Sequence, residues 1–317
     1  MQHVYSLAEV RSSGPSIVAV GVFDGVHRGH QHLLRRLVHT AHANDCVPAV
    51  LTFHPHPDVV LGFAQGRYYL STLEERAALL HSLGVEIVVT HPFDEDVRQV
   101  RAADFVDRLL AHLNLAGLWV GRDFALGYRR EGTVDFLRQQ GEQKGFTLEV
   151  VDLVSNDGNN QTLNSKNIRT ALEAGDIETA NRWLGRPYRL AGEVVYGDGR
   201  GRQIGFPTAN IDVWSEKLLP ARGVYAGWAY LGDERFMAVT NVGHRPTFDG
   251  RVVRVEAHLL DFDRDIYGET LVFDLVARLR TEMRFDGVDA LVAQIRRDVN
   301  QGRELLSQQD QDTRGAK

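Results

Sequence analysis

Hydrophobic positions follow different patterns in the two halves of the chain. In the first half, short apolar runs that predict buried strands alternate with segments whose apolar residues recur every three or four positions, as on one face of a helix. The predicted strands are 17–22, 49–53, 85–90, 118–121 and 148–151, and the predicted helices are 31–43, 73–83, 103–113 and 134–144. This βαβ succession predicts a Rossmann-like α/β domain with a parallel sheet over residues 1–185.

The second half has strand-like runs without helices between them. The runs 190–196, 224–230, 236–240, 252–260 and 270–277 are separated by glycine-rich turns, which predicts an antiparallel β-barrel domain over residues 186–305. Apolar residues at helical spacing from 288 to about 304 predict a terminal helix that packs on the barrel. The polar residues 306–317 are predicted to form a disordered tail.

The composition narrows the class of protein. The 317 residues, 43% of them hydrophobic, are enough to bury two cores. A net charge of −6 without a basic run argues against nucleic acid as a partner. The single cysteine, Cys46, excludes an internal disulfide and a cysteine-cluster metal site. Because no apolar stretch reaches membrane-spanning length and the start lacks a secretory signal, we expect a cytoplasmic protein with no membrane partner.

The segment Gly21-Val-Phe-Asp-Gly-Val-His-Arg-Gly-His30 joins a predicted strand to a predicted helix. Its glycines allow the backbone to approach a ligand closely, and the amide groups at the start of the helix would face an anion. His27 and His30 share one face of the helix and can donate hydrogen bonds to oxygens on which charge builds during nucleotidyl transfer. The alternative is a pair of solvent-facing histidines at a helix start.

Loops after two other predicted strands carry further candidate residues. Thr52-Phe-His-Pro-His-Pro57 places Phe53, His54 and His56 at a carboxyl strand end, where parallel sheets bind their ligands, and the two histidines could line the pocket. A rigid exposed turn is the alternative. Gly121-Arg-Asp-Phe-Ala-Leu-Gly127 places Asp123 after another strand, where it would contact a nucleotide or hold a loop through backbone amides.

Two adjacent motifs lie at the start of the predicted barrel. Gly197-Asp-Gly-Arg-Gly201 can wrap phosphate with backbone amides. In Gly205-Phe-Pro-Thr-Ala-Asn210, Thr208 and Asn210 share one face of an extended chain. Their side-chain oxygens suit Mg²⁺ that bridges the phosphates of ATP. The alternative is a turn in which these side chains bond to their own backbone.

A row of polar residues lies in the predicted strand 252–260. Alternation places Arg254, Glu256 and His258 on one face of that strand. A carboxylate such as Glu256 can accept the proton of an alcohol that is being phosphorylated. The alternative is a solvent-facing polar row.

Two of these motifs resemble known families. Residues 21–30 resemble the His-x-Gly-His signature of nucleotidyltransferases in the longer form of bacterial FAD synthetases, and Gly205-Phe-Pro-Thr-Ala-Asn-Ile211 resembles the signature of riboflavin kinases. Together they resemble the bifunctional riboflavin kinase/FAD synthetase family, up to about residue 305. The resemblance implies that the protein phosphorylates riboflavin to FMN with ATP and Mg²⁺. It also implies that the protein adenylylates FMN to FAD with a second ATP and releases pyrophosphate.

The resemblance also implies roles for the residues that match the family's motifs. The implied catalytic residues are the base Glu256 and the charge-stabilising residues His27, His30 and Arg169. The implied metal ligands are Thr208 and Asn210. The implied flavin contacts are Phe53, His54, Arg284 and Phe285, with a core phenylalanine as the alternative for the last. The implied nucleotide-binding residues are Gly21, Phe23, Asp24, Gly25, Gly29, Asp123, Ser165, Lys166, Gly197, Gly201, Gly205 and Pro207.

One segment departs from the family's usual pattern. Asn164-Ser-Lys-Asn-Ile-Arg169 stands where the family has Ser-Ser-Thr-x-Ile-Arg, so Asn164 and Lys166 replace a serine and the threonine. A lysine still binds phosphate as a point charge. Three functions therefore stay open: the two-step enzyme, a riboflavin kinase with an inactive front domain, and a flavin sensor without turnover. The sequence also leaves the oligomeric state open.

Overall fold

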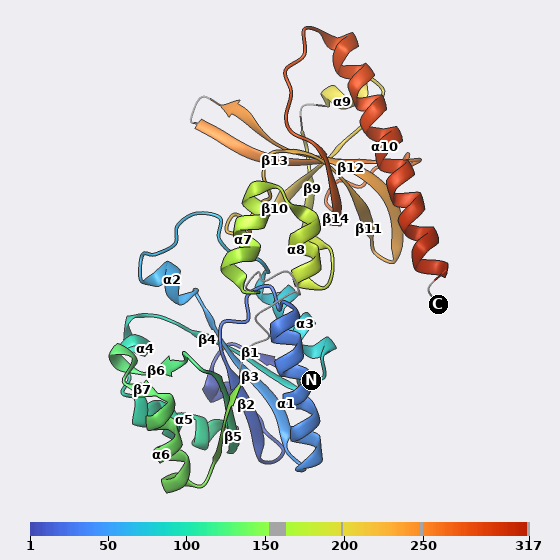
Figure 1. Ribbon diagram of the computed structural model, residues 1–317. Coiled ribbons are helices and arrows are strands. Elements are labelled where there is room, and N and C mark those ends of the chain that lie inside the picture. The colour runs from blue at the N-terminus through green and yellow to red at the C-terminus, as the bar shows by residue number, and fades with distance from the viewer. Residues whose placement is uncertain (152–162, 198, 248–249, 316–317) are drawn as a thin grey trace. The chain divides into compact units, whose positions relative to one another are not determined.

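The computed structural model describes residues 1–151, 163–197, 199–247 and 250–315, with the side chains of 244–252 and of residues beyond 312 outside the description. The chain forms two compact units, residues 1–165 and 166–317 (Figure 1). Each unit is described by itself below.

Within the described residues of the first unit, six strands form one parallel sheet, as the periodicity predicts (Figure 1). Its strands, from edge to edge, are β1 (Gln2–Val4), β4 (Ile87–Pro92), β3 (Val47–His54), β2 (Ser16–Val20), β5 (Leu115–Gly121) and β8 (Thr147–Val151). The chain moves from β2 to β3 and β4 on one side and then crosses to β5 on the other. The carboxyl ends of β2 and β5 therefore flank the point where the strand order reverses, which is where open α/β sheets bind ligands.

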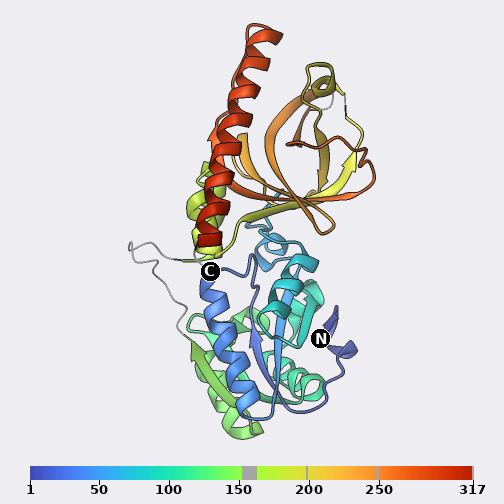
Figure 2. The same cartoon turned by 90° about the vertical axis from the view of Figure 1, so that its right-hand side faces the viewer.

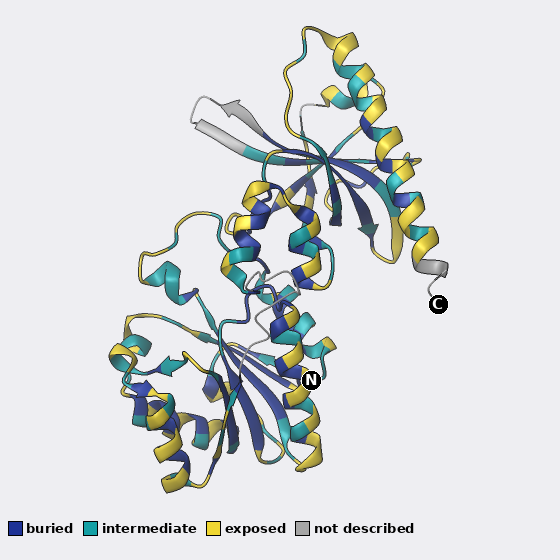
Figure 3. Cartoon of the chain, in the orientation of Figure 1, coloured by how far each residue is buried: buried dark blue, intermediate teal, exposed yellow. Residues whose placement is uncertain are grey.

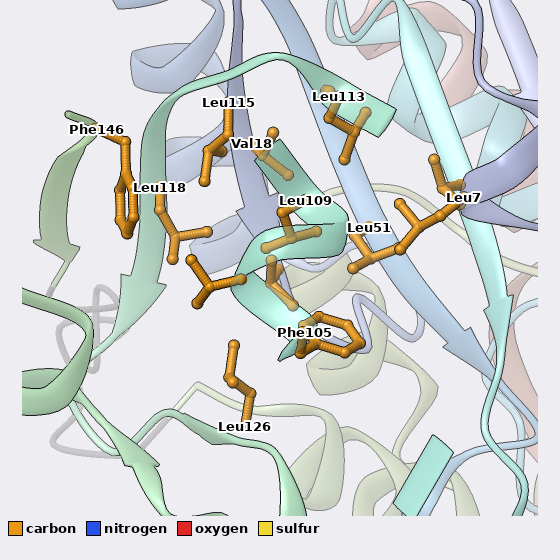
Figure 4. Packing of buried hydrophobic residues seen from close by; sticks show 14 of the residues in the cluster. Leu7, Val18, Leu51, Phe105, Leu109, Leu113, Leu115, Leu118, Leu126 and Phe146 are labelled. Atoms are coloured by element: carbon orange, nitrogen blue, oxygen red, sulfur yellow. The ribbon is translucent and has the colours of Figure 1, made fainter. Parts of the chain in front are cut away.

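Helices cover both faces of this sheet. Ile17 and Ala19 of β2 pack with α1 (Arg28–Ala43) and α3 (Leu73–Ser82). Val18 and Val20 face the opposite core, shown in Figure 4, with α5 (Ala102–Leu113) and α6 (Val134–Lys144). Because alternate residues of a strand point to opposite faces, a strand covered on both sides has to be apolar throughout, and every residue of β2 is buried (Figure 3).

Short elements surround the sheet. At its carboxyl edge, β3 leads into α2 (Pro57–Val60), β4 leads into α4 (Glu95–Gln99), and β5 leads into β6 (Ala125–Leu126), the 3-10 turn η2 (Tyr128–Arg130) and β7 (Gly132–Thr133). The 3-10 turn η1 (Leu7–Glu9) follows β1. The sequence analysis predicts neither these elements nor β1, because each is too short to show a period.

The second unit contains a closed antiparallel barrel, as predicted (Figure 2). Its strands, in order around the barrel, are β10 (Ala209–Val213), β13 (Gly250–Leu259), β12 (Glu234–Thr247), β11 (Gly223–Leu231), β14 (Thr270–Arg280) and β9 (Tyr188–Val195). The short helix α9 (Arg200–Gln203) lies between β9 and β10. The sequence analysis does not predict β10 as a strand. Asn210 and Asp212 alternate with its apolar residues as in a half-buried strand, but the run is only five residues long.

Two helices before the barrel belong to the same unit. Residues of α7 (Ser165–Ala174) and α8 (Ile177–Leu184) bond to barrel strands. Asn181 Nδ2 donates to the carbonyl of Leu275 at 2.8 Å, and Arg278 Nη1 donates to the carbonyl of Ala174 at 3.3 Å. The compact units therefore divide after Ser165, whereas the predicted domain boundary after residue 185 stays a prediction.

The terminal helix α10 (Val288–Gly315) runs along the outside of the barrel (Figure 2). The prediction of a disordered tail from residue 306 is therefore wrong as far as Gly315. Leu306 is completely buried, Trp228 Nε1 donates to Gln309 Oε1 at 3.4 Å, and Asp310 pairs with Arg235 at 2.6 Å. These contacts bind Gln309 and Asp310 to the barrel, although composition alone predicts that such polar residues lie in a disordered tail. None of the described helices is both long enough and apolar enough to cross a membrane.

We expect Leu306→Ala to destabilise the barrel unit by about 2–5 kcal/mol, because it removes a fully buried side chain and leaves a cavity. Urea unfolding of the full chain measures the change. Glu304→Ala, two residues away on the exposed face of α10, is the matched control and should cost less than about 0.5 kcal/mol. Equal stabilities of the two variants would contradict the docking of this part of the helix.

Candidate functional site

The connection between β2 and α1 has a compact, unusual backbone. Phe23, Gly25 and Val26 all have positive φ, at 51°, 77° and 40°. This conformation is costly for residues with a side chain, and it persists only where the surroundings hold it. Phe23 and Val26 are buried in the core beneath α1, and this packing stabilises their backbone conformation. The predicted glycine-rich turn is therefore a rigid loop at the carboxyl end of β2.

His27 caps the amino end of α1. Its Nδ1 accepts a hydrogen bond from the backbone N–H of His30 at 3.3 Å. The two imidazole rings stack with centroids 3.6 Å apart. Because Nδ1 accepts, the ring proton of His27 lies on Nε2, which makes Nε2 a hydrogen-bond donor. The helix cap thus fixes the tautomer of a predicted catalytic residue.

His30 is held as a neutral imidazole. Burial lowers the pKa of His30 well below 6.5, and the neighbouring His27 and Arg76 lower it further. Its ring also meets the ring of Phe23 edge to face, at 5.0 Å between centroids. At neutral pH His30 can therefore donate a hydrogen bond but supplies no positive charge.

Asp24 lies at the centre of a buried polar network. It is 1% exposed, and its carboxylate accepts hydrogen bonds from the N–H of Leu70, from the N–H and hydroxyl of Ser71, and from Arg76 Nη2 at 3.4 Å. The side chain of Arg76 is also 1% exposed, so the pair is an ion pair removed from water. These contacts make Asp24 the anchor of the loop before α3. Its contact with nucleotide stays a prediction.

The network extends to the neighbouring strand and to Ser165. Arg76 Nη1 donates to Thr52 Oγ1 at 3.2 Å, and Thr52 Oγ1 donates to the carbonyl of Val22 at 2.6 Å. Ser165 Oγ donates to the carbonyl of Asp24 at 3.0 Å, so a predicted phosphate-binding serine lies against the histidine motif. The sequence analysis does not identify Arg76, although an arginine in the apolar stripe of α3 is a signal that a buried partner exists.

Other predicted residues of this unit lie at the same sheet edge. The ring of Phe53 packs against Phe93, at 5.7 Å between centroids, and the ring of His54 lies 5.4 Å from that of Tyr69. The side chain of Asp123 is exposed, and its carbonyl accepts from Arg130 Nη2 at 2.9 Å. Contacts of these residues with flavin or nucleotide stay predictions.

Lys166 and Arg169 lie in α7 and belong to the second unit. Lys166 is exposed, whereas Arg169 is buried. Their approach to the two histidines stays a prediction.

Three neighbouring barrel strands place polar residues in one row. Asn210 of β10 lies directly opposite Glu256 of β13, which lies directly opposite Asn241 of β12. Directly opposed residues point to the same side of a sheet, with Cβ atoms about 4.5–5.5 Å apart. The predicted base therefore lies beside one predicted metal ligand. Thr208 lies two residues before Asn210, one residue outside β10.

The glycine-rich turn packs against both predicted metal ligands. A Cβ atom at Gly197 would lie 2.1 Å from Asn210 Nδ2. One at Gly201 would lie 2.3 Å from the carbonyl oxygen of Phe206 and 3.4 Å from Thr208 Oγ1. Only glycine permits this approach without displacing the ligands. Gly205 has a φ of 83° and open space around its Cα.

The donor set fits Mg²⁺ held jointly with phosphate. The hydroxyl of Thr208 and the amide oxygen of Asn210 are hard ligands, and Gly201 and Gly197 of the glycine-rich turn pack against these two side chains. Among the residues that the structure describes, no group of three His, Cys, Asp or Glu side chains could hold a metal. A magnesium ion at Thr208 and Asn210 would therefore take its remaining ligands from water and phosphate.

The segment between β14 and α10 carries the last predicted pair. Arg284 is exposed, and the ring of Phe285 lies 5.8 Å from the guanidinium carbon of Arg280. Arg280 in turn pairs with Asp298 of α10 at 2.8 Å. Arg280 at the end of β14 thus contacts both this segment and α10. The contact of Arg284 and Phe285 with flavin stays a prediction.

Comparison with known proteins matches both units. Residues 10–166 match the FAD synthetase family, and residues 184–306 match the riboflavin kinase family. The bifunctional riboflavin kinase/FMN adenylyltransferase of Listeria monocytogenes is 36% identical over 92% of each chain. The proteins of the same name from Pseudomonas fluorescens and Escherichia coli are 38% and 35% identical, over 97% and 96% of this chain and 98% and 96% of their own.

The chain belongs to the bifunctional riboflavin kinase/FMN adenylyltransferase family. Because both families match, the alternatives of a kinase with an inactive front domain and of a flavin sensor receive no support. A crystal structure titled as a macrolide-efflux protein of Streptococcus pneumoniae has a similar fold, with a TM-score of 0.86 and 29% identity over 95% of this chain and 98% of that one. The fold of that protein thus matches nearly the whole of this chain.

We expect Arg76→Met to destabilise the first unit by about 3–5 kcal/mol, because it leaves the carboxylate of Asp24 buried without its cation. Thermal and urea unfolding measure the loss. The double variant Asp24→Asn, Arg76→Met removes the stranded charge and should recover part of the stability. An Arg76→Met variant as stable as the parent chain would show that the pair does not hold this family's histidine loop.

Proposed function

We propose that this chain phosphorylates riboflavin at the barrel and adenylylates FMN at the carboxyl edge of the parallel sheet. ATP is the co-substrate of both reactions, and the products are FMN and FAD. The observation that carries the kinase assignment is the row of Asn210 and Glu256 on adjacent strands, beside a glycine-rich turn. The observation that carries the adenylyltransferase assignment is the stacked histidine pair at the start of α1.

In the kinase reaction, Glu256 accepts the proton of the ribityl 5′-hydroxyl as that oxygen attacks the γ-phosphorus of ATP. The new P–O bond gives FMN, and the bond to the bridging oxygen breaks to release ADP. A carboxylate on an extended strand is held at a fixed distance from the residues opposite it, which suits a base that has to meet one hydroxyl.

Thr208 and Asn210 would hold Mg²⁺ against the phosphates. When bound, this ion neutralises charge that develops on the β- and γ-phosphoryl oxygens. The turn 197–201 would wrap the same phosphates with backbone amides, which requires the close contact of Gly197 with Asn210. Arg284 and Phe285 would contact the isoalloxazine ring.

In the adenylyl transfer, a phosphate oxygen of FMN attacks the α-phosphorus of ATP, and pyrophosphate leaves. His27 Nε2 and the neutral His30 donate hydrogen bonds to phosphoryl oxygens, and the amino end of α1 adds its free amides. Because both imidazoles act as donors, positive charge has to come from elsewhere. Lys166 and Arg169 would supply it, and Phe53 and His54 would contact the flavin.

We expect Glu256→Gln to lower the riboflavin kinase rate by about 10²–10⁴-fold and to leave FAD formation from supplied FMN unchanged. Chromatographic separation of the flavins, in reactions started from riboflavin and from FMN, measures both steps. Glu193→Gln, an exposed barrel residue on β9, is the matched control. A full kinase rate in Glu256→Gln would refute the base assignment, and failure of the parent chain to form FAD from FMN would refute the second activity.

A second expectation concerns pH. Because the pKa of His30 lies below 6.5, its neutral form dominates above that pH and is lost only as the pH falls toward the lowered pKa. FMN adenylylation should therefore show no loss due to His30 between pH 6.5 and 8, and it should decline below that range. A tenfold loss per pH unit above 6.5 that disappears in His30→Gln would show instead that the protonated imidazole is required.

A further inference from the structure

His258 connects the strand of the proposed base to the segment of the proposed metal ligands. It lies two residues after Glu256 in β13, on the same face of that strand. Its Nδ1 lies 2.7 Å from the carbonyl oxygen of Pro207, and its ring meets that of Phe206 edge to face, at 5.5 Å between centroids. Pro207 immediately precedes Thr208.

We propose that His258 is a positioning residue that fixes Thr208 relative to Glu256 through its hydrogen bond to Pro207. The inference rests on the proposed function of Thr208 as a ligand. Thr208 lies one residue before β10, and the pairing of β10 with β13 begins at the next residue, Ala209. Pro207 has no N–H and is itself exposed. Its carbonyl is therefore the backbone group by which this point of the segment is held to β13.

The bond has a defined direction. A carbonyl oxygen can only accept, so Nδ1 of His258 carries the proton and donates. The neutral tautomer with its proton on Nδ1 and the imidazolium both meet this requirement. The anchor therefore does not depend on the charge of the imidazole.

A second contact joins the same strand to another residue of the segment. Arg254, two residues before Glu256, donates from Nη1 to Asn210 Oδ1 at 3.5 Å. The base thus lies between two side chains of its own strand, and each contacts one part of the segment that carries the metal ligands. The distances from Glu256 to Thr208 and Asn210 therefore depend on the conformation of one strand, β13.

The test separates the hydrogen bond from the ring contact. His258→Phe keeps a ring beside Phe206 and removes the donor, whereas His258→Asn keeps a donor near the position of Nδ1. We expect His258→Phe to raise the KM for MgATP in the kinase reaction about 3- to 10-fold, the effect of one lost hydrogen bond, with the KM for riboflavin within twofold. His258→Asn should restore the KM for MgATP to within twofold of the parent chain.

A readout without turnover complements the kinetics. Arg200 and Arg202 of the short helix α9, which overlaps the end of the glycine-rich turn, are exposed and are cleavage points for trypsin. Tryptic cleavage there should be about 3- to 10-fold faster in His258→Phe than in the parent chain or in His258→Asn, and MgADP should protect the parent chain more than the phenylalanine variant. The control is Arg264→Gln, which removes a 2.8 Å hydrogen bond to Glu234 at the start of β12. It should change neither measurement.

The outcomes distinguish this inference from the proposed function. An unchanged KM for MgATP and unchanged cleavage in His258→Phe would overturn the positioning role, as would a fall in kcat alone, which indicates lost folded enzyme. Thr208→Ala and Asn210→Ala test the metal assignment separately. If these two variants keep full kinase activity, the proposed function of the segment fails, whatever His258→Phe does.

Discussion

The buried ion pair of Asp24 and Arg76 is the constraint on which the first unit depends. A carboxylate withdrawn from water has to find charge and hydrogen bonds inside the protein, and Asp24 finds them in the loop before α3 and in Arg76. Thr52 links the pair to β3, and Ser165 links it to the start of α7. Segments far apart in the sequence are thereby fixed around the loop that presents His27. The polar network thus stabilises the carboxyl edge of the sheet, whereas apolar packing stabilises the sheet itself.

The barrel positions its candidate residues in a different way. Here the strand register sets the distances, because Asn210, Glu256 and Asn241 are opposed residues of three adjacent strands. The backbones of two opposed residues cannot separate unless hydrogen bonds between their strands break. Local additions then refine the row, from the glycines packed on Thr208 and Asn210 to the bond between His258 and Pro207. The first unit thus positions its candidate residues through buried side-chain hydrogen bonds, and the second through the register of its strands.

Periodicity predicts both architectures, because strands buried on two faces are continuously apolar and a barrel lacks helices between its strands. It does not predict β10, which is only five residues long, nor the last turns of α10, where Gln309 and Asp310 are bound by the barrel. Motifs likewise single out the candidates His27, His30, Thr208 and Asn210, but not the residues that hold them. Arg76 and His258 act through residues distant in sequence, and only the fold brings those partners together.

The position of the glycine-rich turn within the barrel has one more consequence. The turn lies in the connection between β9 and β10, two strands that pair directly in the closed barrel. Under the proposed function, a nucleotide bound by this turn would bind only the folded barrel, and its binding energy would add to the free energy of unfolding of this unit. Nucleotide binding and folding would then be thermodynamically linked, with the substrate itself as the stabilising ligand.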